Sequence, residues 1–339
     1  MRRSSGKRRG AMAFERSIYT AWAVVWPEKR KEASMASCSE CASKGSCSNS
    51  TMTGGNGQCT DINDVLAQQD RRIARARSHI RYKILVTSGK GGVGKSSITV
   101  NLAVALAQMG HKVGLLDVDI HGPSVPHLLG LDSHIEAAPD GGFLPAPYRD
   151  NLSVVSMQVL LRDKDEPVLW RGTMKGKAIR DFISDVHWGD LDFLIIDSPP
   201  GTGDEPMTVL ESIPEALCVV VTTPQEISLA DVRKTVNFLA KAHANTLGIV
   251  ENMSGLICPH CHKTIDLFKK GGGEKLANEH GLPFLGAIPL DPAAVVASDN
   301  GTPIVAMDES LPSKTALLEL ARKVAQGAAN SLEVLALTE

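Results

Sequence analysis

A glycine-rich segment places a lysine and a serine where they could bind phosphate. It matches the pattern G-x-x-x-x-G-K-S/T, with an apolar stretch before it and a helical pattern after it, as the motif requires. Glycines let backbone N–H groups turn inward around phosphate, and the N-terminus of a helix adds positive potential. We therefore expect Lys95 to reach the β- and γ-phosphates of a nucleotide and the Ser96 hydroxyl to ligate Mg²⁺. The residues expected to line this site are Gly89, Lys90, Gly91, Gly92, Val93, Gly94, Lys95, Ser96 and Ser97.

Two carboxylates follow apolar stretches and could complete the site. Asp197 ends one such stretch, and Asp119 lies just beyond another that ends at Asp117. The carboxyl ends of parallel strands meet at one edge of a sheet, where ligands bind. Asp197 is thus suited to the Mg²⁺ shell. An aspartate at the end of a strand also often caps a helix or forms a turn, and that alternative stays open here.

A pair of cysteines, Cys258 and Cys261, occupies a predicted loop. A redox pair normally follows a strand at the start of a helix, which this pair does not clearly do. A zinc site would need four ligands, and His260 and His262 are spaced too tightly for easy tetrahedral closure. Two cysteines per chain become four in a dimer, and four thiolates are the ligand set of a 4Fe–4S cluster.

Short apolar stretches that alternate with helical patterns must position these residues. The expected strands are 83–87, 112–117, 152–157, 193–197, 218–222, 247–251 and 284–288. The expected helices are 96–108, 172–186, 228–242 and 313–332. Near-continuous apolar strands are buried on both faces, so the pattern predicts an α/β fold with a doubly wound, mostly parallel sheet. Cys218 lies within one of these strands and is expected to be core, and the glycine run 271–273 is expected to be a hinge or a helix entry, since no lysine follows it in the place a phosphate loop requires.

The composition excludes several classes of protein. Of 339 residues, 43% are hydrophobic and 22% charged, which is enough apolar material for a core. No run of 18 apolar residues predicts a membrane span. Aromatic residues are only 4%, and the net charge is −2, so neither single-stranded nucleic-acid binding nor general attraction to nucleic acid is expected.

The chain divides into four expected parts. Residues 1–34 form a basic arm, and Met35 resembles a natural start, so we expect either a mis-called extension or a disordered or targeting arm. Residues 35–60 are rich in Cys, Ser and Gly and should be disordered unless a metal orders them. A helical lead-in covers 61–82, and the phosphate-binding domain covers 83–339.

The extra lysine inside the glycine-rich loop, Lys90, gives the segment a resemblance to a known class. It resembles the deviant Walker motif of the MinD, ParA, nitrogenase-reductase and Mrp families of P-loop NTPases. The resemblance implies that Lys90 reaches across a dimer interface to the nucleotide of the partner, and hence a homodimer. A second cation near the γ-phosphate would offset negative charge in the transition state.

Five segments between about Ile80 and Leu332 resemble the Mrp family of iron–sulfur carrier ATPases. These segments are residues 117–126, 169–179, 197–209, 250–261 and 286–292. The resemblance implies a homodimer that carries a 4Fe–4S cluster between Cys258 and Cys261 of two subunits. It also implies transfer of the cluster to apo iron–sulfur proteins, with slow ATP hydrolysis, and a cytoplasmic location is expected.

The resemblance also implies roles for three further residues. Asp119 would hold or activate the attacking water near Mg²⁺, Asn252 would contact adenine, and the segment at Pro289 would pass the other side of the base. ATP is favoured over GTP because the guanine motif N-K-x-D is absent.

Four cysteines precede the phosphate-binding domain. Cys38, Cys41 and Cys47 match the end of the N-terminal four-cysteine cluster site of eukaryotic cytosolic relatives, but Val24 occupies the place of the fourth ligand. Cys59 would have to substitute from downstream. A second cluster, another metal site and a thiol-rich tail without metal all stay open.

Two other functions remain as alternatives. A positioning ATPase like MinD or ParA would need a basic amphipathic membrane helix or DNA-binding features, whereas the C-terminal segment is acidic and apolar. A nucleotide-gated electron carrier like nitrogenase reductase takes its two cluster cysteines from separate parts of the chain. The carrier hypothesis is therefore preferred.

Overall fold

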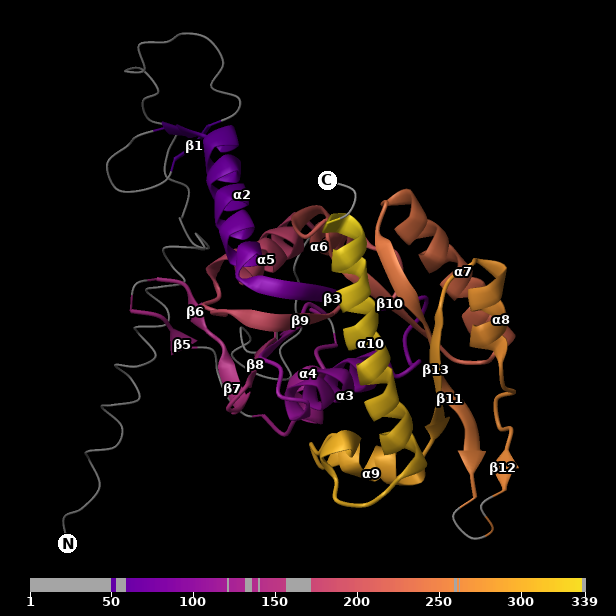
Figure 1. Cartoon of the computed structure of the whole chain (residues 1–339). Coiled ribbons are helices and arrows are strands. Elements are labelled where there is room, and N and C mark those ends of the chain that lie inside the picture. Colours follow the sequence, from indigo (N-terminus) through magenta and orange to yellow (C-terminus); the bar gives the residue numbers. More distant parts are fainter. Residues whose placement is uncertain are drawn as a thin grey trace, which may run out of the picture.

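A computed structural model describes residues 50–52, 59–120, 122–131, 136–139, 141–156, 172–258, 261 and 263–336 (Figure 1). The expected arms and tail within 1–49 lie outside these residues. The strands are β1 Ser50–Met52, β2 Cys59–Asp61, β3 Ile80–Ser88, β4 Val113–Asp117, β5 Glu136–Ala137, β6 Phe143–Leu144, β7 Ala146–Arg149, β8 Leu152–Ser156, β9 Leu191–Asp197, β10 Leu217–Thr222, β11 Asn245–Ile257, β12 Thr264–Ile265 and β13 Phe284–Leu290. The helices are α2 Ile62–Ser78, α3 Lys95–Gln108, α4 Val125–Leu128, α5 Gly172–Asp185, α6 Asp204–Ser212, α7 Glu226–Lys241, α8 Gly272–Glu279, α9 Pro292–Asp299, α10 Pro312–Ala336 and the 3₁₀ turn η2 Ile304–Ala306.

One nine-stranded sheet organises the described part of the chain. Its strand order is β12-β11-β10-β3-β9-β4-β8-β7, with β13 also paired to β11. The pairings are parallel except for β12 with β11 and β7 with β8. The expected mostly parallel α/β fold is confirmed. Because the inner strands are parallel, the carboxyl ends of β3, β4, β8, β9 and β10 meet at a single edge.

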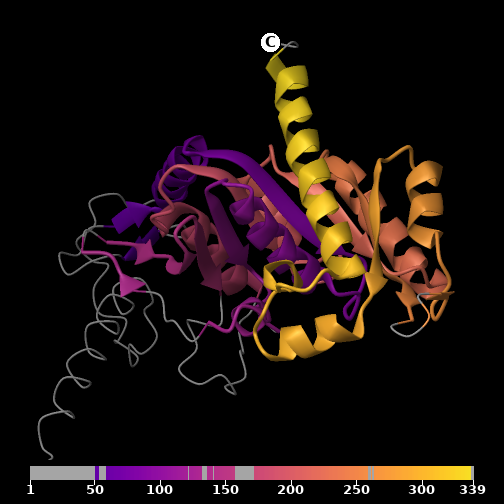
Figure 2. The same cartoon turned by 60° about the horizontal axis from the view of Figure 1, so that its bottom comes forward.

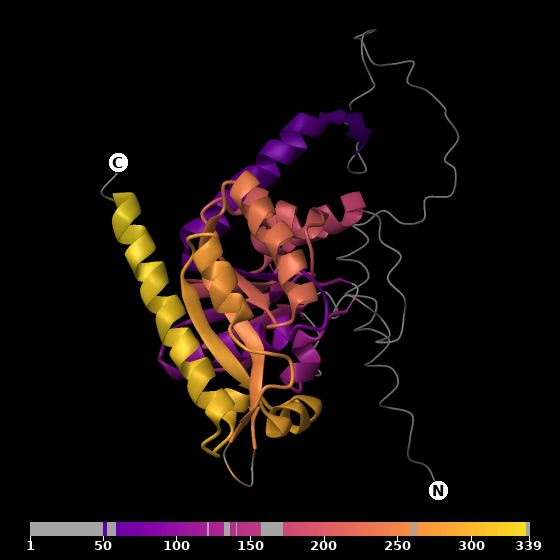
Figure 3. The same cartoon turned by 90° about the vertical axis from the view of Figure 1, so that its right-hand side faces the viewer.

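Helices cover both faces of this sheet. Figure 3 shows α10 on one side of the sheet and α7 and α5 on the other. Consecutive residues of β3 serve opposite faces, as the alternation of a strand requires. Ile84 and Val86 belong to the hydrophobic cluster with α3 and α10, whereas Leu85 belongs to the cluster with α2, α5, α6 and α7. Burial on both faces explains why the strands are apolar without interruption.

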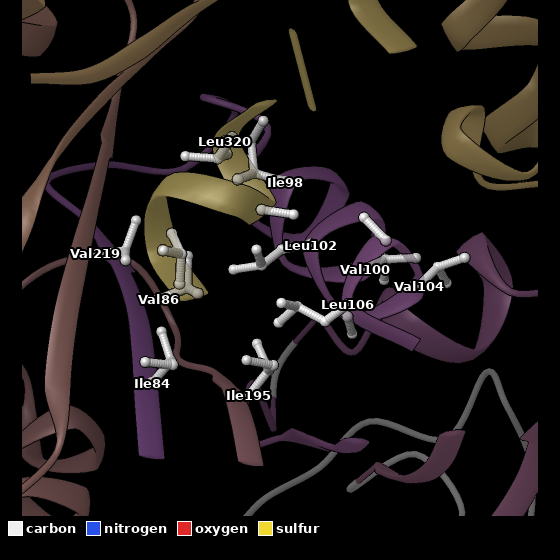
Figure 4. Close-up of a cluster of buried hydrophobic side chains, with 14 of the residues drawn as sticks. Ile84, Val86, Ile98, Val100, Leu102, Val104, Leu106, Ile195, Val219 and Leu320 are labelled. Atoms are coloured by element: carbon white, nitrogen blue, oxygen red, sulfur yellow. The ribbon is translucent and has the colours of Figure 1, made fainter. Parts of the chain in front are cut away.

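The helix that follows the glycine-rich loop, α3, lies deep in one of these clusters. Figure 4 shows its Ile98, Leu102 and Leu106 packed toward Ile84 and Val86 of β3. All five side chains are at most 2% exposed. Complete burial of such a side chain stabilises a fold by about 1.5–3 kcal/mol. The core therefore fixes the helix whose first turn carries the predicted phosphate ligands.

The strand β11 is longer than the sequence predicts. It continues from Glu251, its expected end, to Ile257, directly before Cys258. The polar residues after Glu251 hide this extension, which depends on pairing with distant segments. Leu256 pairs with Ile265 of β12 in antiparallel register and with Leu290 of β13 in parallel register.

The last helix, α10, packs along the sheet beside α3 and ends beyond it. It begins one residue before the expected start and reaches Ala336. Figure 2 shows its C-terminal turns projecting from the rest of the domain. Among the described residues, no helix combines the length and the apolar character that crossing a membrane requires.

Candidate functional site

The glycine-rich loop joins β3 to α3 and is shaped by close neighbours. A Cβ at Gly89 would lie 2.5 Å from the backbone of Asp231, so only glycine fits there. Gly94 precedes α3 with φ of 80°, a conformation that favours glycine. Gly91 and Gly92, between them, are exposed to solvent. The loop is thus tightly packed at Gly89 and Gly94 and open to solvent at Gly91 and Gly92, as a loop that binds phosphate through its backbone requires.

The first turn of α3 carries a buried cluster around Asp197. The Lys95 Nζ lies 2.7 Å from Asp197 Oδ2, and the Ser96 hydroxyl donates to the same oxygen at 2.6 Å. Lys95 is 6% exposed and Asp197 is fully buried. The attraction between the two opposite charges offsets the free-energy cost of removing each of them from water. The structure therefore brings together three residues that the sequence predicts for the nucleotide site.

Thr99 is a further member of this cluster that the sequence reasoning missed. Its hydroxyl donates to Asp197 Oδ1 at 2.6 Å, so both carboxylate oxygens have a hydroxyl donor. The available signal was its spacing: Thr99 lies four residues after Lys95, on the same face of α3. Its contact holds the Asp197 carboxylate in one orientation against the helix. Ser97, also predicted for the site, is half-buried in the same turn.

Mg²⁺ would find a suitable donor set at this cluster. The Ser96 hydroxyl and the Asp197 carboxylate are adjacent oxygen donors, and Mg²⁺ prefers oxygen ligands. The residues therefore fit the ion that the sequence predicts. Their assignment as its ligands stays a prediction.

The two aspartates of the neighbouring strand differ in environment. Asp117 pairs in register with Asp197 and is fully buried, whereas Asp119 is half-buried beyond the strand end. Burial, and next the charge of Asp197, raise the pKa of the Asp117 carboxyl to about 8. Asp117 accepts hydrogen bonds from Ser156 Oγ at 2.9 Å and from the Asp119 backbone N–H at 3.0 Å. Asp117 thereby holds the backbone that presents Asp119 at the edge of the sheet.

Lys90 lies in the loop between Gly89 and Gly91. It is half-buried, and among the described residues it forms no ion pair. Its backbone carbonyl accepts a hydrogen bond from Ser88 Oγ at 3.0 Å. The side-chain ammonium is therefore available to an anion, as the cross-dimer role requires, although that role remains a prediction.

Asn252 lies against the loop from the side of β11. Its Nδ2 donates to the Val93 carbonyl at 2.8 Å, and a Cβ at Gly94 would lie 2.2 Å from that nitrogen. Asn252 also pairs in register with Ile288, the neighbour of Pro289 in β13. The structure thus places Asn252, Pro289 and the loop together, and the predicted adenine contact is untested.

The cysteine pair follows the end of β11. Cys258 is half-buried, and its N–H donates to the Lys263 carbonyl at 3.0 Å, whereas Cys261 is exposed. Neither cysteine forms a disulfide. No helix begins at the pair, since the described chain continues into β12. Within the described residues no three His, Cys, Asp or Glu side chains are grouped as metal ligands, and His260 and His262 lie outside them.

The other cysteines fall into two groups. Cys218 is fully buried in β10, as expected of a core residue, and burial raises the pKa of its thiol to about 12. Cys59 begins β2, where it pairs with Met52. Cys38, Cys41 and Cys47 lie outside the described residues, so their predicted metal role is untested.

Solved structures share this architecture. A nucleotide-binding protein of Archaeoglobus fulgidus, determined in complex with ADP, has a TM-score of 0.61 and 39% identity, covering 68% of this chain and 91% of the other. The cell-division ATPase MinD of Pyrococcus furiosus has a TM-score of 0.53 and 25% identity, covering 73% and 99%. The expected P-loop NTPase fold of the MinD type is confirmed.

Sequence relatives cover most of the chain. The iron-sulfur cluster carrier protein of Methanocaldococcus jannaschii is 50% identical over 251 residues, which are 74% of this chain and 87% of that protein. The cytosolic Fe-S cluster assembly factor Nubp2 homolog 2 of Drosophila yakuba is 48% identical over 242 residues, 70% and 92% of the two chains. The family model described as NUBPL iron-transfer P-loop NTPase matches residues 79–325. These matches confirm the resemblance found in the sequence, and the chain belongs to this family of iron-transfer P-loop NTPases.

Proposed function

We propose that this protein is an ATP-hydrolysing carrier of iron–sulfur clusters that acts as a homodimer. The observation that carries the proposal is the position of Asn252. It contacts the phosphate loop, and the strand on which it lies, β11, ends at Ile257, directly before Cys258. One strand therefore joins the candidate nucleotide site to a pair of thiols. We infer that the cargo is an iron–sulfur cluster because the two relatives are named as an iron-sulfur cluster carrier and an Fe-S cluster assembly factor.

Nucleotide binding would use charges that are already in place. The Lys95 ammonium is held 2.7 Å from Asp197 in the first turn of α3, so a cation already lies where the loop and the helix N-terminus would receive a polyphosphate. When bound, Mg²⁺ would be held by Ser96 and Asp197 and would neutralise phosphate charge. Thr99 would keep Asp197 in position while Lys95 turns to the phosphates.

Hydrolysis would follow from the residues around the γ-phosphate. Asp119 would orient a water for attack on the γ-phosphorus, and the bond between that phosphorus and the bridging oxygen of ADP would break. Lys90 of each subunit would offset charge on the nucleotide of its partner. The low solvent exposure of Lys95 and Asp197 strengthens such electrostatic effects.

Cluster binding would need both subunits. Cys258 and Cys261 supply two thiolates per chain, and a 4Fe–4S cluster takes four. The exposed Cys261 would place the cargo where an apo-protein client can approach it. We assign the activity to the cytoplasm because the Drosophila relative is named as a cytosolic assembly factor.

Anaerobic reconstitution of the full chain with iron and sulfide tests this proposal. A background in which Cys38, Cys41, Cys47 and Cys59 are replaced by Ser isolates the proposed bridging site. We expect about four iron atoms per dimer by iron analysis and native mass. Replacing Cys258 and Cys261 by Ala in that background should remove the iron and leave ATP binding intact. Iron retained in that variant, or iron bound to a monomer, would refute the bridging site.

A further inference from the structure

The residues that carry the cysteine pair form one closed segment. We call the described residues within 254–271 the cysteine segment; it begins at Ser254 and ends at Gly271. Both ends bind the same carboxylate oxygen. Glu251 Oε1 accepts from the Ser254 hydroxyl at 2.6 Å and from the Gly271 N–H at 3.0 Å. A single side chain thus closes the base of the segment.

The second oxygen of Glu251 fixes the helix that follows. Glu251 Oε2 accepts from the Gly273 N–H at 2.6 Å, in the first turn of α8. A Cβ at Gly273 would lie 3.0 Å from the Glu251 Cβ, so the absence of a side chain permits this approach. Glu251 is fully buried, and its negative charge faces the positive end of α8. The glycine run is accordingly a helix entry, built around one buried carboxylate.

The next residue along β11 connects to the phosphate loop. Asn252 donates to the Val93 carbonyl, and the space at Gly94 is too small for any side chain beside it. Met253, between Asn252 and the cysteine segment, then adopts φ of 57°, which is uncommon for a residue other than glycine. Two consecutive residues therefore hold two functional elements, because Asn252 contacts the nucleotide loop and Glu251 holds the cysteine segment.

We propose that Glu251 is a positioning residue that keeps the cysteine segment in fixed relation to the phosphate loop, so that nucleotide binding alters the reactivity of Cys258 and Cys261. The inference rests on the proposed function for the meaning of this coupling. Its physical basis is that Asn252 is hydrogen-bonded to Val93, so a displacement of the loop there acts on Asn252, and Glu251 is the preceding residue of β11. Two hydrogen bonds then pass the shift to the ends of the segment at Ser254 and Gly271, and a third passes it to α8 at Gly273.

The test compares Glu251→Gln with Glu279→Gln in the full chain. Glutamine has one acceptor oxygen in place of two, so an amide N–H₂ must face either the donors at Ser254 and Gly271 or the Gly273 N–H. In either orientation residue 251 no longer holds the segment and α8 together. Glu279 also belongs to the α8 region, but it is exposed and pairs with Arg233 at 3.2 Å. The readout is the alkylation rate of Cys258 and Cys261 in the apo-protein, resolved by peptide mass spectrometry with and without ADP or a non-hydrolysable ATP analogue.

We expect nucleotide to change the alkylation rate in the wild type by about fivefold or more, within the usual range of coupling between sites. Glu279→Gln should keep the ratio of the alkylation rates measured with and without nucleotide. Glu251→Gln should bring this ratio close to one while nucleotide affinity stays unchanged. A purely structural role would lower the melting temperature and leave the ratio as it was. An unchanged ratio in Glu251→Gln, or no nucleotide effect in the wild type, would overturn the inference.

Two additions keep the result decisive. If Glu251→Gln does not fold, Ser254→Ala removes one donor from the same carboxylate and should lower the ratio in a folded protein. Iron reconstitution of the wild type is measured alongside. Absence of iron there would refute the carrier function, whereas the alkylation ratio of the apo-protein would still decide the role of Glu251.

Discussion

The phosphate loop and the cysteine segment are built to different degrees of completeness. Around the loop, Asp197 is fully buried and receives Ser96, Thr99 and Lys95 within 2.7 Å. In the cysteine segment, Cys261 is exposed and Cys258 is half-buried. One region is preorganised within a single chain, and the other presents two thiols that a four-ligand cluster would have to complete with a second chain.

In the proposed function, this difference assigns the two regions to two tasks. Phosphate chemistry benefits from charges fixed in advance in a site of low dielectric constant. A cargo that must be given away benefits from ligands near the surface, held by the protein only at their base. Glu251 holds that base, and it lies next to the residue that contacts the phosphate loop.

The sharpest way to separate the two regions is Lys95→Ala. Without the ammonium, the polyphosphate loses its main cation and Asp197 is left as an uncompensated buried charge. We expect ATP hydrolysis to fall by at least about a hundredfold and the free energy of unfolding to fall by about 3–5 kcal/mol. Steady-state phosphate release and urea unfolding measure the two effects.

The matched control for that change is Lys90→Ala. Lys90 forms no ion pair among the described residues, so its removal should leave the free energy of unfolding nearly unchanged while hydrolysis still falls. Both variants should retain reconstituted iron, because neither lysine is among the proposed cluster ligands. Hydrolysis that survives Lys95→Ala would contradict the assignment of the phosphate loop.

Glycine substitutions compare the packing of the two regions, and we expect them to lower the free energy of unfolding by less than Lys95→Ala does. Gly94→Ala combines φ of 80° with an approach of 2.2 Å to Asn252, and we expect it to cost about 2–4 kcal/mol in unfolding free energy. Gly255→Ala, in the cysteine segment, has φ of 75° but a nearest contact of 3.0 Å to the Thr264 methyl. It should cost only the strain, about 1–2 kcal/mol.

Urea unfolding measures both changes against Gly110→Ala. Gly110 has φ of 92° and nothing within 4 Å of an added Cβ, so it reports the backbone strain alone. Nucleotide affinity should fall in Gly94→Ala and stay unchanged in the other two variants. If Gly94→Ala costs no more than Gly110→Ala, the loop is not packed tightly against Asn252.

The two regions also differ in how far the sequence could predict them. The glycine pattern demands a specific backbone, and the apolar runs before Asp117 and Asp197 demand burial on two faces. The sheet edge and the grouping of Lys95 and Ser96 with Asp197 therefore follow from local sequence. Thr99 was missed although its helical spacing was readable. Its partner, Asp197, lies 98 residues away, and only the tertiary structure joins them.

The cysteine segment was harder to predict because distant pairings shape it. The sequence ends β11 at Glu251, where polar residues begin, but β12 and β13 extend the strand to Ile257. A glutamate after an apolar run gives no sign that it will bind Ser254 and two glycine N–H groups. Such a contact depends on where the chain returns, which no local pattern specifies.

Asp117, the buried carboxylate beside Asp197, should make the stability of the fold depend on pH. Burial and the charge of Asp197 raise the pKa of Asp117 to about 8, above its ordinary value of 3.8. The folded protein therefore binds a proton that the unfolded chain releases, and stability falls as pH rises between these two values. Between pH 6 and 8, the free energy of unfolding of the wild type should fall by up to about 1.4 kcal/mol per pH unit through this group. Asp117→Asn should remove that dependence on pH. Urea unfolding of nucleotide-free protein measures the slope, with Asp308→Asn, an exposed carboxylate, as the control. Equal slopes in wild type and Asp117→Asn would show that Asp117 is ionised in the fold.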